Sequence, residues 1–482
     1  MTDRYHVVLV APPANPFAEG LREVAESIVF GLRQTGRHAG FAVNGVDRDS
    51  INIILNPHLL GDDAARALPP ETILCNFEQV HGDSSWMKLV YVDLVRRHVT
   101  WDYSRRNVAA WQRYVPDARV LHVPLGYVPE LTRIPVGGED IDVLFYGSLN
   151  ERRERVLKGL EAKGLRVVSA IKFGAERDEL IKRAKLVLNV HYYDSKIFEM
   201  PRVAYLLANR KAVVSEIDEH TDVEADLRDA VAGAPYDGLV GKCIALLGDD
   251  AARRALAERG FAAFTQRSAA RILDEAIGAP VVGSPREKVE LPPRLNAGSG
   301  KGWRIDSLNI DIDPLWRPDL VADLGKPLPA EPVDLGRFGH RPLPAGHFDE
   351  IHASHVLEHI PDLVTAMTSF LTLLREGGTL HAEVPYDLSH GAWQDPTHVR
   401  AMNERSWLYY TDWFWYLGWQ EHRFDMVELR YILSDLGRKL TASGMPAEDL
   451  LRQPRAVDAM RATLRKVRLT DDERSRGANR WA

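Results

Sequence analysis

The chain has 482 residues, a length that suggests about three domains of ordinary size. Its formal charge of −7 argues against a nucleic-acid-binding protein, and its two cysteines, far apart in the sequence, exclude a disulfide scaffold and favour the cytoplasm. No segment approaches the length of a membrane span, and we expect no signal sequence before the first strand.

Strands that alternate with helices predict an open α/β sheet over residues 1–135. Its expected elements are buried strands at 6–10, 51–55, 71–77 and 120–123 and a helix over 17–34. A second α/β set is predicted over 139–277, with strands at 143–146, 186–191 and 212–216. The stretch 278–293 contains four prolines and no clear periodicity, and is the expected linker.

The second set contains a predicted anion site. The strand 143–146 runs into Gly147, and Arg152 and Arg153 stand at the start of the following helix. Backbone amides, a helix dipole and guanidinium groups together attract an anion. Glu199 and Arg202 follow a later strand, and ligands bind just past the strand ends of such sheets. A solvated helix face is the alternative for the arginine pair.

Residues 5–275 resemble the GT-B-fold glycosyltransferases, because they contain Phe-Tyr-Gly-Ser at 145–148 and Phe-Glu-x-x-Arg at 198–202. The resemblance implies a nucleotide-sugar donor whose diphosphate faces Arg152 or Arg153, with Glu199 and Arg202 beside the sugar and nucleotide. The chain departs from the family at Tyr205, which stands near the place of a second glutamate.

A glycosyltransferase of this kind needs a base near the acceptor, because sugar hydroxyls are poor nucleophiles at neutral pH. The resemblance implies that this base belongs to the amino-terminal half, where His81 and Asp102 are the candidates. A surface or capping histidine is the alternative for His81. For Asp102 the alternative is an Asx turn or a helix N-cap.

A second nucleotide-cofactor domain is predicted over residues 294–470. A short apolar strand leads into the glycine turn at 296–300, and Asp311 and Asp323 end the next two predicted strands. Another strand begins at 348–351. Acids at successive strand ends line one edge of a parallel sheet, where a ribose and an adenine are hydrogen-bonded.

Residues 290–420 resemble the class I S-adenosylmethionine-dependent methyltransferases, through this glycine turn, the two aspartates and the segments 355–360 and 374–380. The resemblance implies that Gly298 and Gly300 border the methionine portion, that Asp311 holds the ribose and that Asp323 reads the adenine. Asn296 stands where the family commonly has an acid, and His355 is expected next to the cofactor.

The loop at 391–400 follows the strand that ends at 384–385, so it is expected at the cofactor edge. Its Asp395 and His398 are suited to removing a hydroxyl proton during methyl transfer. The alternative is that they only close a proline turn. His355 and His359, one helical turn apart, would fit a zinc site together with these two residues. The resemblance to metal-independent methyltransferases leads us to expect no dedicated metal.

Eight of the thirteen residues at 407–419 are aromatic. Core packing of a lid, a homodimer interface, a membrane surface and a platform for sugar rings are the alternatives. The region from 425 onwards is expected to be helical, because apolar residues at 429, 432, 433 and 436 have helical spacing, and the chain is expected to end in a charged tail.

The sequence therefore predicts an α/β protein with a GT-B-like pair of Rossmann-like domains followed by a class I methyltransferase domain. The expected function is that of a cytoplasmic glycosyltransferase and O-methyltransferase, with S-adenosylmethionine and a nucleotide sugar as ligands. It would act on a glycan such as a bacterial surface polysaccharide, as a monomer or a homo-oligomer. The alternative is a methyltransferase whose GT-B-like half only binds the acceptor.

Overall fold

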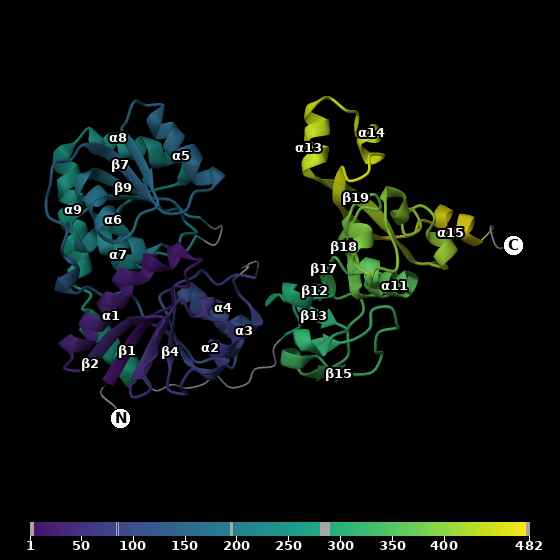
Figure 1. Cartoon of the computed structure of the whole chain (residues 1–482), viewed down its shortest axis with the longest axis horizontal. Coiled ribbons are helices and arrows are strands. Elements are labelled where there is room, and N and C mark those ends of the chain that lie inside the picture. The colour runs from purple at the N-terminus through teal and green to yellow at the C-terminus, as the bar shows by residue number, and fades with distance from the viewer. Residues whose placement is uncertain (1–3, 83, 85, 193–195, 280–289, 479–482) are drawn as a thin grey trace. The chain divides into compact units, whose positions relative to one another are not determined.

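The computed structural model describes residues 4–82, 84, 86–192, 196–279 and 290–478. It divides the chain into two compact units, Met1–Glu287 and Lys288–Ala482 (Figure 1). Each unit has its own sheets and its own hydrophobic core. Among the described residues, no helix combines the length and the apolar character that a membrane span requires.

The first half of the first unit is a parallel six-stranded sheet with the order β2-β1-β3-β4-β5-β6. The strands are β1 (Arg4–Leu9), β2 (His38–Val43), β3 (Ile51–Leu55), β4 (Ile73–Asn76), β5 (Val99–Asp102) and β6 (Val120–His122). The helices are α1 (Arg22–Gln34), α2 (Asp62–Arg66), α3 (Leu89–Arg97) and α4 (Arg105–Tyr114), with a 3₁₀ turn at Pro16–Leu21 before α1. Its inner strands are continuous apolar runs because helices cover both faces of a parallel sheet.

The second half is a parallel five-stranded sheet with the order β11-β10-β9-β7-β8. The strands are β7 (Ile141–Tyr146), β8 (Val167–Ala170), β9 (Ala184–Asn189), β10 (Val213–Glu216) and β11 (Ala232–Ala234). The helices are α5 (Glu151–Glu161), α6 (Gly174–Arg183), α7 (Met200–Ala208), α8 (Leu239–Leu247), α9 (Asp250–Thr265) and α10 (Ala269–Gly278). From β7 the chain goes first to β8 on one side of β7 and then crosses to β9 on the other side. The carboxyl ends of β7 and β9 therefore flank a switch point.

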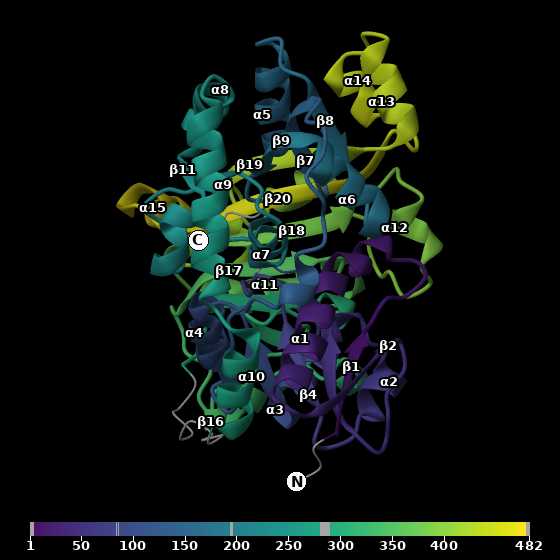
Figure 2. The same ribbon diagram turned by 90° about the vertical axis from the view of Figure 1, so that its left-hand side faces the viewer.

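The two halves of this unit pack on each other through helices. α1 lies directly below α7 in Figure 1, and the view turned by 90° in Figure 2 shows the same order. The last helix, α10, returns to the first half: a Cβ added at Gly31 of α1 would lie 2.7 Å from Leu273 Cδ1. Glycine at this position therefore allows α1 and α10 to approach closely.

The second unit is built on a seven-stranded sheet with the order β14-β13-β12-β17-β18-β20-β19. The strands are β12 (Arg294–Ala297), β13 (Leu308–Asp311), β14 (Leu320–Val321), β17 (Phe348–Ser354), β18 (Leu374–Pro385), β19 (His422–Leu433) and β20 (Val457–Arg468). β20 is antiparallel to both of its neighbours, and the other pairs are parallel. The switch point lies between β12 and β17. The parallel α/β fold expected for all three parts of the chain is confirmed.

Short elements complete the second unit. They are the small hairpin β15 (Val333–Asp334) and β16 (His340–Arg341), and the helices α11 (Leu363–Leu373), α12 (Gly391–Gln394), α13 (Asp435–Ala442), α14 (Ala447–Leu451) and α15 (Asp471–Ala478).

The helix predicted from residue 425 is wrong, because this region begins with strand β19. In β19, Phe424 is buried and the half-buried apolar side chains lie at 426, 429, 431, 432 and 433, with one step of three between 426 and 429. That step coincides with a bulge in the pairing with β20 between Met426 and Glu428. A bulge inserts one residue and shifts the side-chain alternation. The residues 429, 432 and 433 have the spacing of a helix because a second irregularity of this pairing lies between Ile432 and Leu433, and residue 436 already belongs to α13.

Candidate functional site

The carboxyl edge of β12 carries the glycine turn. Gly298 has φ +65° and packs on the loop after the neighbouring strand β17. A Cβ added to Gly298 would lie 2.3 Å from Val356 Cγ2. Gly300 has φ +41°, and no described heavy atom lies within 4 Å of a Cβ added to it. Gly298 therefore serves close packing, whereas Gly300 faces open space at the switch point.

Asp311 at the end of β13 holds the glycine turn in place. Gly300 N donates to Asp311 Oδ2 at 2.7 Å, and Asp313 N donates to Oδ1 at 2.9 Å. Each carboxylate oxygen keeps a second lone pair for a further donor. Between the two glycines, the Ser299 hydroxyl is buried and has no hydrogen-bond partner among the described residues. The turn therefore presents a polar group to whatever occupies this edge.

The other two predicted cofactor residues of this edge lie in different settings. Asn296 is buried and donates through Nδ2 to Gly302 O at 2.9 Å and to Asn309 Oδ1 at 3.0 Å, so it supports the turn from inside. Asp323 follows β14 and accepts a hydrogen bond from Gly325 N at 2.9 Å, with its side chain one third exposed. Asp323 is therefore accessible at the sheet edge, and Asn296 is not.

The segment after β17 does not form the expected helical histidine pair. His355 has φ +51°, and the chain then makes a 3₁₀ turn at Leu357–His359, so His355 and His359 do not share an α-helix face. His355 Nε2 lies 3.2 Å from Glu383 Oε1, and its Nδ1 lies 3.4 Å from Glu358 Oε1. The Glu358 carboxylate beside the imidazole raises the pKa of His355. The left-handed backbone at 355 ends the strand and turns the chain away from the sheet.

The loop at 391–400 lies against this 3₁₀ turn, because Val399 N donates to Glu358 O at 2.9 Å. The rings of His359 and His398 are 4.6 Å apart and nearly perpendicular. His398 Nδ1 lies 3.0 Å from Ala392 O. The loop thus brings His398 across to the residues that follow β17.

Asp395 is tied to a different histidine from the one that the sequence analysis paired it with. Its Oδ1 accepts hydrogen bonds from the hydroxyl and the backbone N–H of Thr397, at 2.7 and 2.9 Å, and these lower the pKa of Asp395. The Thr397 hydroxyl in turn lies 2.9 Å from His359 Nδ1. Asp395 therefore closes the turn and orients His359 through Thr397, while Ala392 orients His398.

The aromatic segment divides into a buried part and an exposed part. Trp407, Tyr410, Phe414 and Trp419 belong to the core of the second unit. Tyr409, Trp413 and Tyr416 are 45%, 36% and 53% exposed, and Tyr409 forms edge contacts with the rings of the other two. Core packing accounts for the first group. The second group is an exposed aromatic cluster.

In the first unit, a cleft lies between the carboxyl edges of the two sheets. Of the predicted donor-site residues, Gly147, Arg153, Glu199 and Arg202 line it. Gly147 has φ +127°, and a Cβ there would lie 2.7 Å from the Arg202 guanidinium. Glycine therefore lets the arginine lie directly over the turn after β7.

The charges in this cleft are partly paired. Arg153 Nη2 donates to Glu199 Oε1 at 2.8 Å and to Val190 O at 2.6 Å, and burial lowers the pKa of Arg153 to about 10. Arg202 Nη1 donates to Asn189 Oδ1 at 2.9 Å. Asn150 caps α5 by accepting from Arg153 N at 3.0 Å, which places Arg153 at the helix start.

Arg152 and Asp102 are not placed as the sequence analysis expected. Arg152 forms an ion pair with the fully buried Glu216 and stacks on Tyr236. It is not one of the described lining residues of the cleft. Asp102 is 1% exposed and accepts hydrogen bonds from Asn76, Ser104, Asn107 and Trp111. Asp102 therefore stabilises the loop after β5 as an Asx turn, which is the alternative that the sequence analysis gave for it.

The cleft contains a carboxylate that the sequence analysis missed. Glu78 and Gln79 line it, whereas His81 of the same loop is not among its described lining residues. Burial raises the pKa of Glu78. The signal in the sequence was its position directly after the strand at 73–76, where ligand groups of a parallel sheet collect. Arg177 is another missed lining residue, and it forms a buried ion pair with Glu23 of α1.

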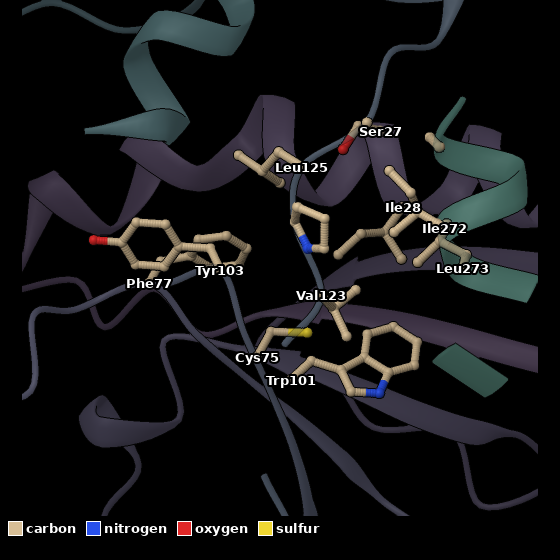
Figure 3. Close-up of a pocket in the computed structure, with 13 residues that line it drawn as sticks. Ser27, Ile28, Cys75, Phe77, Trp101, Tyr103, Val123, Leu125, Ile272 and Leu273 are labelled. Carbon is tan, nitrogen blue, oxygen red and sulfur yellow. The ribbon is translucent and has the colours of Figure 1, made fainter. Parts of the chain in front are cut away.

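A smaller pocket shares Phe77 and Tyr103 with the lining of this cleft and is mostly apolar (Figure 3). Cys75 and Trp101 line it from the sheet, Ile28 from α1 and Leu273 from α10. Its described lining contains no charged side chain, and burial raises the pKa of Cys75. A diphosphate would find no partner there, so the charged cleft is the better candidate for a nucleotide.

The family model of a methyltransferase domain matches residues 295–440. The second unit contains a methyltransferase domain. The match begins in β12, at the glycine turn, and extends into α13, so it includes Asp311 and the loop at 391–400, called the histidine loop below.

Relatives and solved structures with partial similarity exist for both units. Two uncharacterised proteins of Acanthamoeba polyphaga mimivirus are 29% and 30% identical over 170 and 150 residues, which are 33% and 30% of this chain. The chain covers about half of their length, 55% and 52%. A glycosyltransferase structure from Rickettsia africae is 9% identical, with a TM-score of 0.37, over 57% of this chain and 97% of that chain. A SAM-dependent methyltransferase structure from Archaeoglobus fulgidus is 17% identical, with a TM-score of 0.25, over 36% of this chain and 86% of that chain.

Proposed function

We propose that the methyltransferase domain transfers a methyl group from S-adenosylmethionine to a hydroxyl of a glycan. The observation that carries this proposal is the edge at the β12–β17 switch point. The glycine turn is bound to Asp311 there, and Gly298 packs on Val356, directly before the 3₁₀ turn against which the loop at 391–400 lies. A cofactor edge and a group able to take a proton are both needed for O-methylation, and this edge offers both.

The residues of the glycine turn fit the cofactor. The open side of Gly300 and the unpartnered Ser299 hydroxyl would border the methionine portion, Asp311 would accept from the ribose hydroxyls, and Asp323 would accept from the adenine amino group. His355 would border the cofactor from the other strand of the switch point. When bound, S-adenosylmethionine supplies an electrophilic methyl group on a sulfonium.

His398 is the residue that we assign to activating the acceptor. Because its Nδ1 donates to a backbone carbonyl, its Nε2 carries a lone pair. That nitrogen takes the hydroxyl proton as the oxygen bonds to the methyl carbon. Asp395 contributes by holding the turn that positions the loop.

The experiment is methyl transfer from labelled S-adenosylmethionine to saccharide acceptors. His398→Ala should lower the rate about 10²–10⁴-fold with cofactor affinity unchanged. Loss of cofactor affinity in this variant would contradict a role on the acceptor alone. Survival of the rate would leave His398 with only the role of closing the loop.

We also propose that the first unit is a glycosyltransferase that uses a nucleotide sugar. The support is the cleft between two parallel sheets, lined by Arg153, Arg177 and Arg202, with Lys172 on its rim. These side chains and the turn at Gly147 suit a diphosphate. Glu78 replaces Asp102 and His81 as our candidate base, because this residue lines the cleft and burial raises its pKa.

An acceptor-binding module without glycosyl transfer is the second candidate, favoured by one observation. Tyr205 stands near the place of the second glutamate, and its hydroxyl donates to Asp178 and accepts from Arg133. A nucleoside diphosphate should stabilise the wild-type protein against heat, and Arg202→Ala should lose this response. No stabilisation of the wild type at millimolar concentration would favour the binding module.

The substrate and setting follow from both units. The exposed aromatic cluster of Tyr409, Trp413 and Tyr416 suits the apolar faces of sugar rings. Two transferases in one chain would act in succession on one glycan, as in the cytoplasmic assembly of a bacterial surface polysaccharide. Glycan arrays, with a variant in which Tyr409 and Tyr416 are alanine as comparison, test this substrate class.

A further inference from the structure

We propose that Glu358, His359 and His398 of the methyltransferase domain bind a divalent transition-metal ion. One ligand atom of each residue lies within 4.8 Å of those of the other two. Bonds of about 2.0–2.2 Å at tetrahedral angles place the ligand atoms of an ion about 3.4 Å apart. Small side-chain adjustments therefore suffice to close the three around one ion.

Glu358 supplies the first reason to expect a cation. The residue is 2% exposed, and neither carboxylate oxygen has a hydrogen-bond partner among the described residues. A half-exposed histidine, His355, is its charged neighbour, with Nδ1 3.4 Å from Oε1. A carboxylate without donors inside a protein is strongly unfavourable unless a positive charge compensates it. A bound cation supplies that charge.

The two histidines are held in the tautomer that a metal requires. The Thr397 hydroxyl donates to Asp395 at 2.7 Å, so its oxygen accepts from His359 Nδ1 at 2.9 Å. Ala392 O, which can only accept, lies 3.0 Å from His398 Nδ1. Both Nδ1 atoms therefore carry hydrogen, and both Nε2 atoms present lone pairs. Metal-binding histidines are characteristically fixed in this way by a carbonyl or a carboxylate-linked partner.

The donor set favours one class of ion. Two imidazole nitrogens and one carboxylate suit zinc, manganese, iron or cobalt, whereas magnesium and calcium prefer oxygen ligands alone. Three protein ligands leave coordination positions open, as in sites that bind a substrate oxygen. The sequence analysis expected no dedicated metal because the domain resembles metal-independent methyltransferases, and the zinc site that it weighed used 355 and 359 as a helical pair, which the fold does not form.

The metal site extends the proposed methyl transfer. Only the role of the ion in the reaction rests on that proposal. Metal binding replaces the base role proposed above for His398, because Nε2 as a metal ligand cannot also take the proton. The acceptor hydroxyl would then bind the ion, which lowers the pKa of the hydroxyl, and its proton would leave to solvent water as the methyl group arrives. Metal binding itself does not depend on the methyl acceptor.

The test is a titration of the chelator-treated full chain with Co²⁺, followed by visible absorption, and with Zn²⁺, followed by calorimetry. We expect one ion per chain and at least tenfold weaker binding in Glu358→Gln, His359→Asn and His398→Asn. His390→Asn is the matched control, because His390 is an exposed histidine at the start of the same loop. This variant should bind the ion as the wild type does. Thr397→Val should weaken binding about 10–100-fold, because it releases the His359 tautomer.

Circular dichroism and S-adenosylmethionine binding are measured on the same samples, so that unfolded variants are recognised. No Co²⁺ or Zn²⁺ binding by the folded wild type at millimolar concentration would overturn the metal site, as would equal binding by wild type and His398→Asn. Cofactor binding without metal binding would leave the methyltransferase proposal intact. Metal binding without cofactor binding would refute the proposed cofactor site and leave the metal site standing.

Discussion

Asp311→Ala is the sharpest test of the cofactor edge. In the proposed complex the carboxylate accepts from two ribose hydroxyls, and a hydrogen bond to a charged group is worth about 1.5–3 kcal/mol. Loss of both contacts should cost about 3–6 kcal/mol, or about 10²–10⁴-fold in affinity for S-adenosylmethionine. The same change removes the acceptor of Gly300 N at 2.7 Å, so the glycine turn loses its anchor as well.

Calorimetry of S-adenosylmethionine binding is the assay, with urea unfolding as a separate measure of stability. Asp334→Ala is the matched control, because Asp334 also accepts from a nearby backbone N–H, that of Gly336, but lies on the β15–β16 hairpin. The control should keep its cofactor affinity. An affinity within a factor of two of the wild type for Asp311→Ala would refute the reasoning, because the carboxylate would then not face the ribose.

Three further predictions concern stability. Gly298→Ala should destabilise the second unit by at least about 1–2 kcal/mol from its positive φ alone, and urea unfolding with an unchanged midpoint would contradict this. Arg177→Met leaves the buried Glu23 without its main partner and should cost about 3–5 kcal/mol, most of which the double variant with Glu23→Leu should recover; equal loss in both would be the contrary result. Burial raises the pKa of Asp102 to about 7, so the folded state retains its proton while the unfolded chain ionises near pH 4, and stability should fall by about 1.4 kcal/mol per pH unit between about pH 4 and 7. Urea unfolding at several pH values should show this slope in the wild type and not in Asp102→Asn.

Local sequence was sufficient for the parallel strands and the glycine turns. The strand expected at 51–55 is β3 with the same bounds, and the apolar run before Gly298 is β12. A buried parallel strand is a short apolar run, and a turn with positive φ needs glycine, so both leave a mark in neighbouring residues. For this reason the sequence also predicted that polar groups gather at the strand ends.

Contacts between distant residues were decided by the tertiary structure. The bulge in β19 exists only because β20 pairs with it, so the local spacing suggested a helix. Arg153 forms an ion pair with Glu199, 46 residues away. The neighbouring Arg152 forms its ion pair with Glu216, outside the cleft. Two adjacent arginines therefore have different environments, because each one pairs with a different glutamate.

The histidine loop shows the same division. The sequence by itself determined that histidines and acids follow β17 and β18, at the edge where a cofactor is expected. Only the tertiary structure determined that His398 lies near Glu358 and His359, and that Asp395 accepts a hydrogen bond from Thr397. The physical reason is that strand periodicity and turn preferences act over a few residues. Ligand geometry depends on the path of a loop, which here is held by a backbone hydrogen bond from Val399 to Glu358.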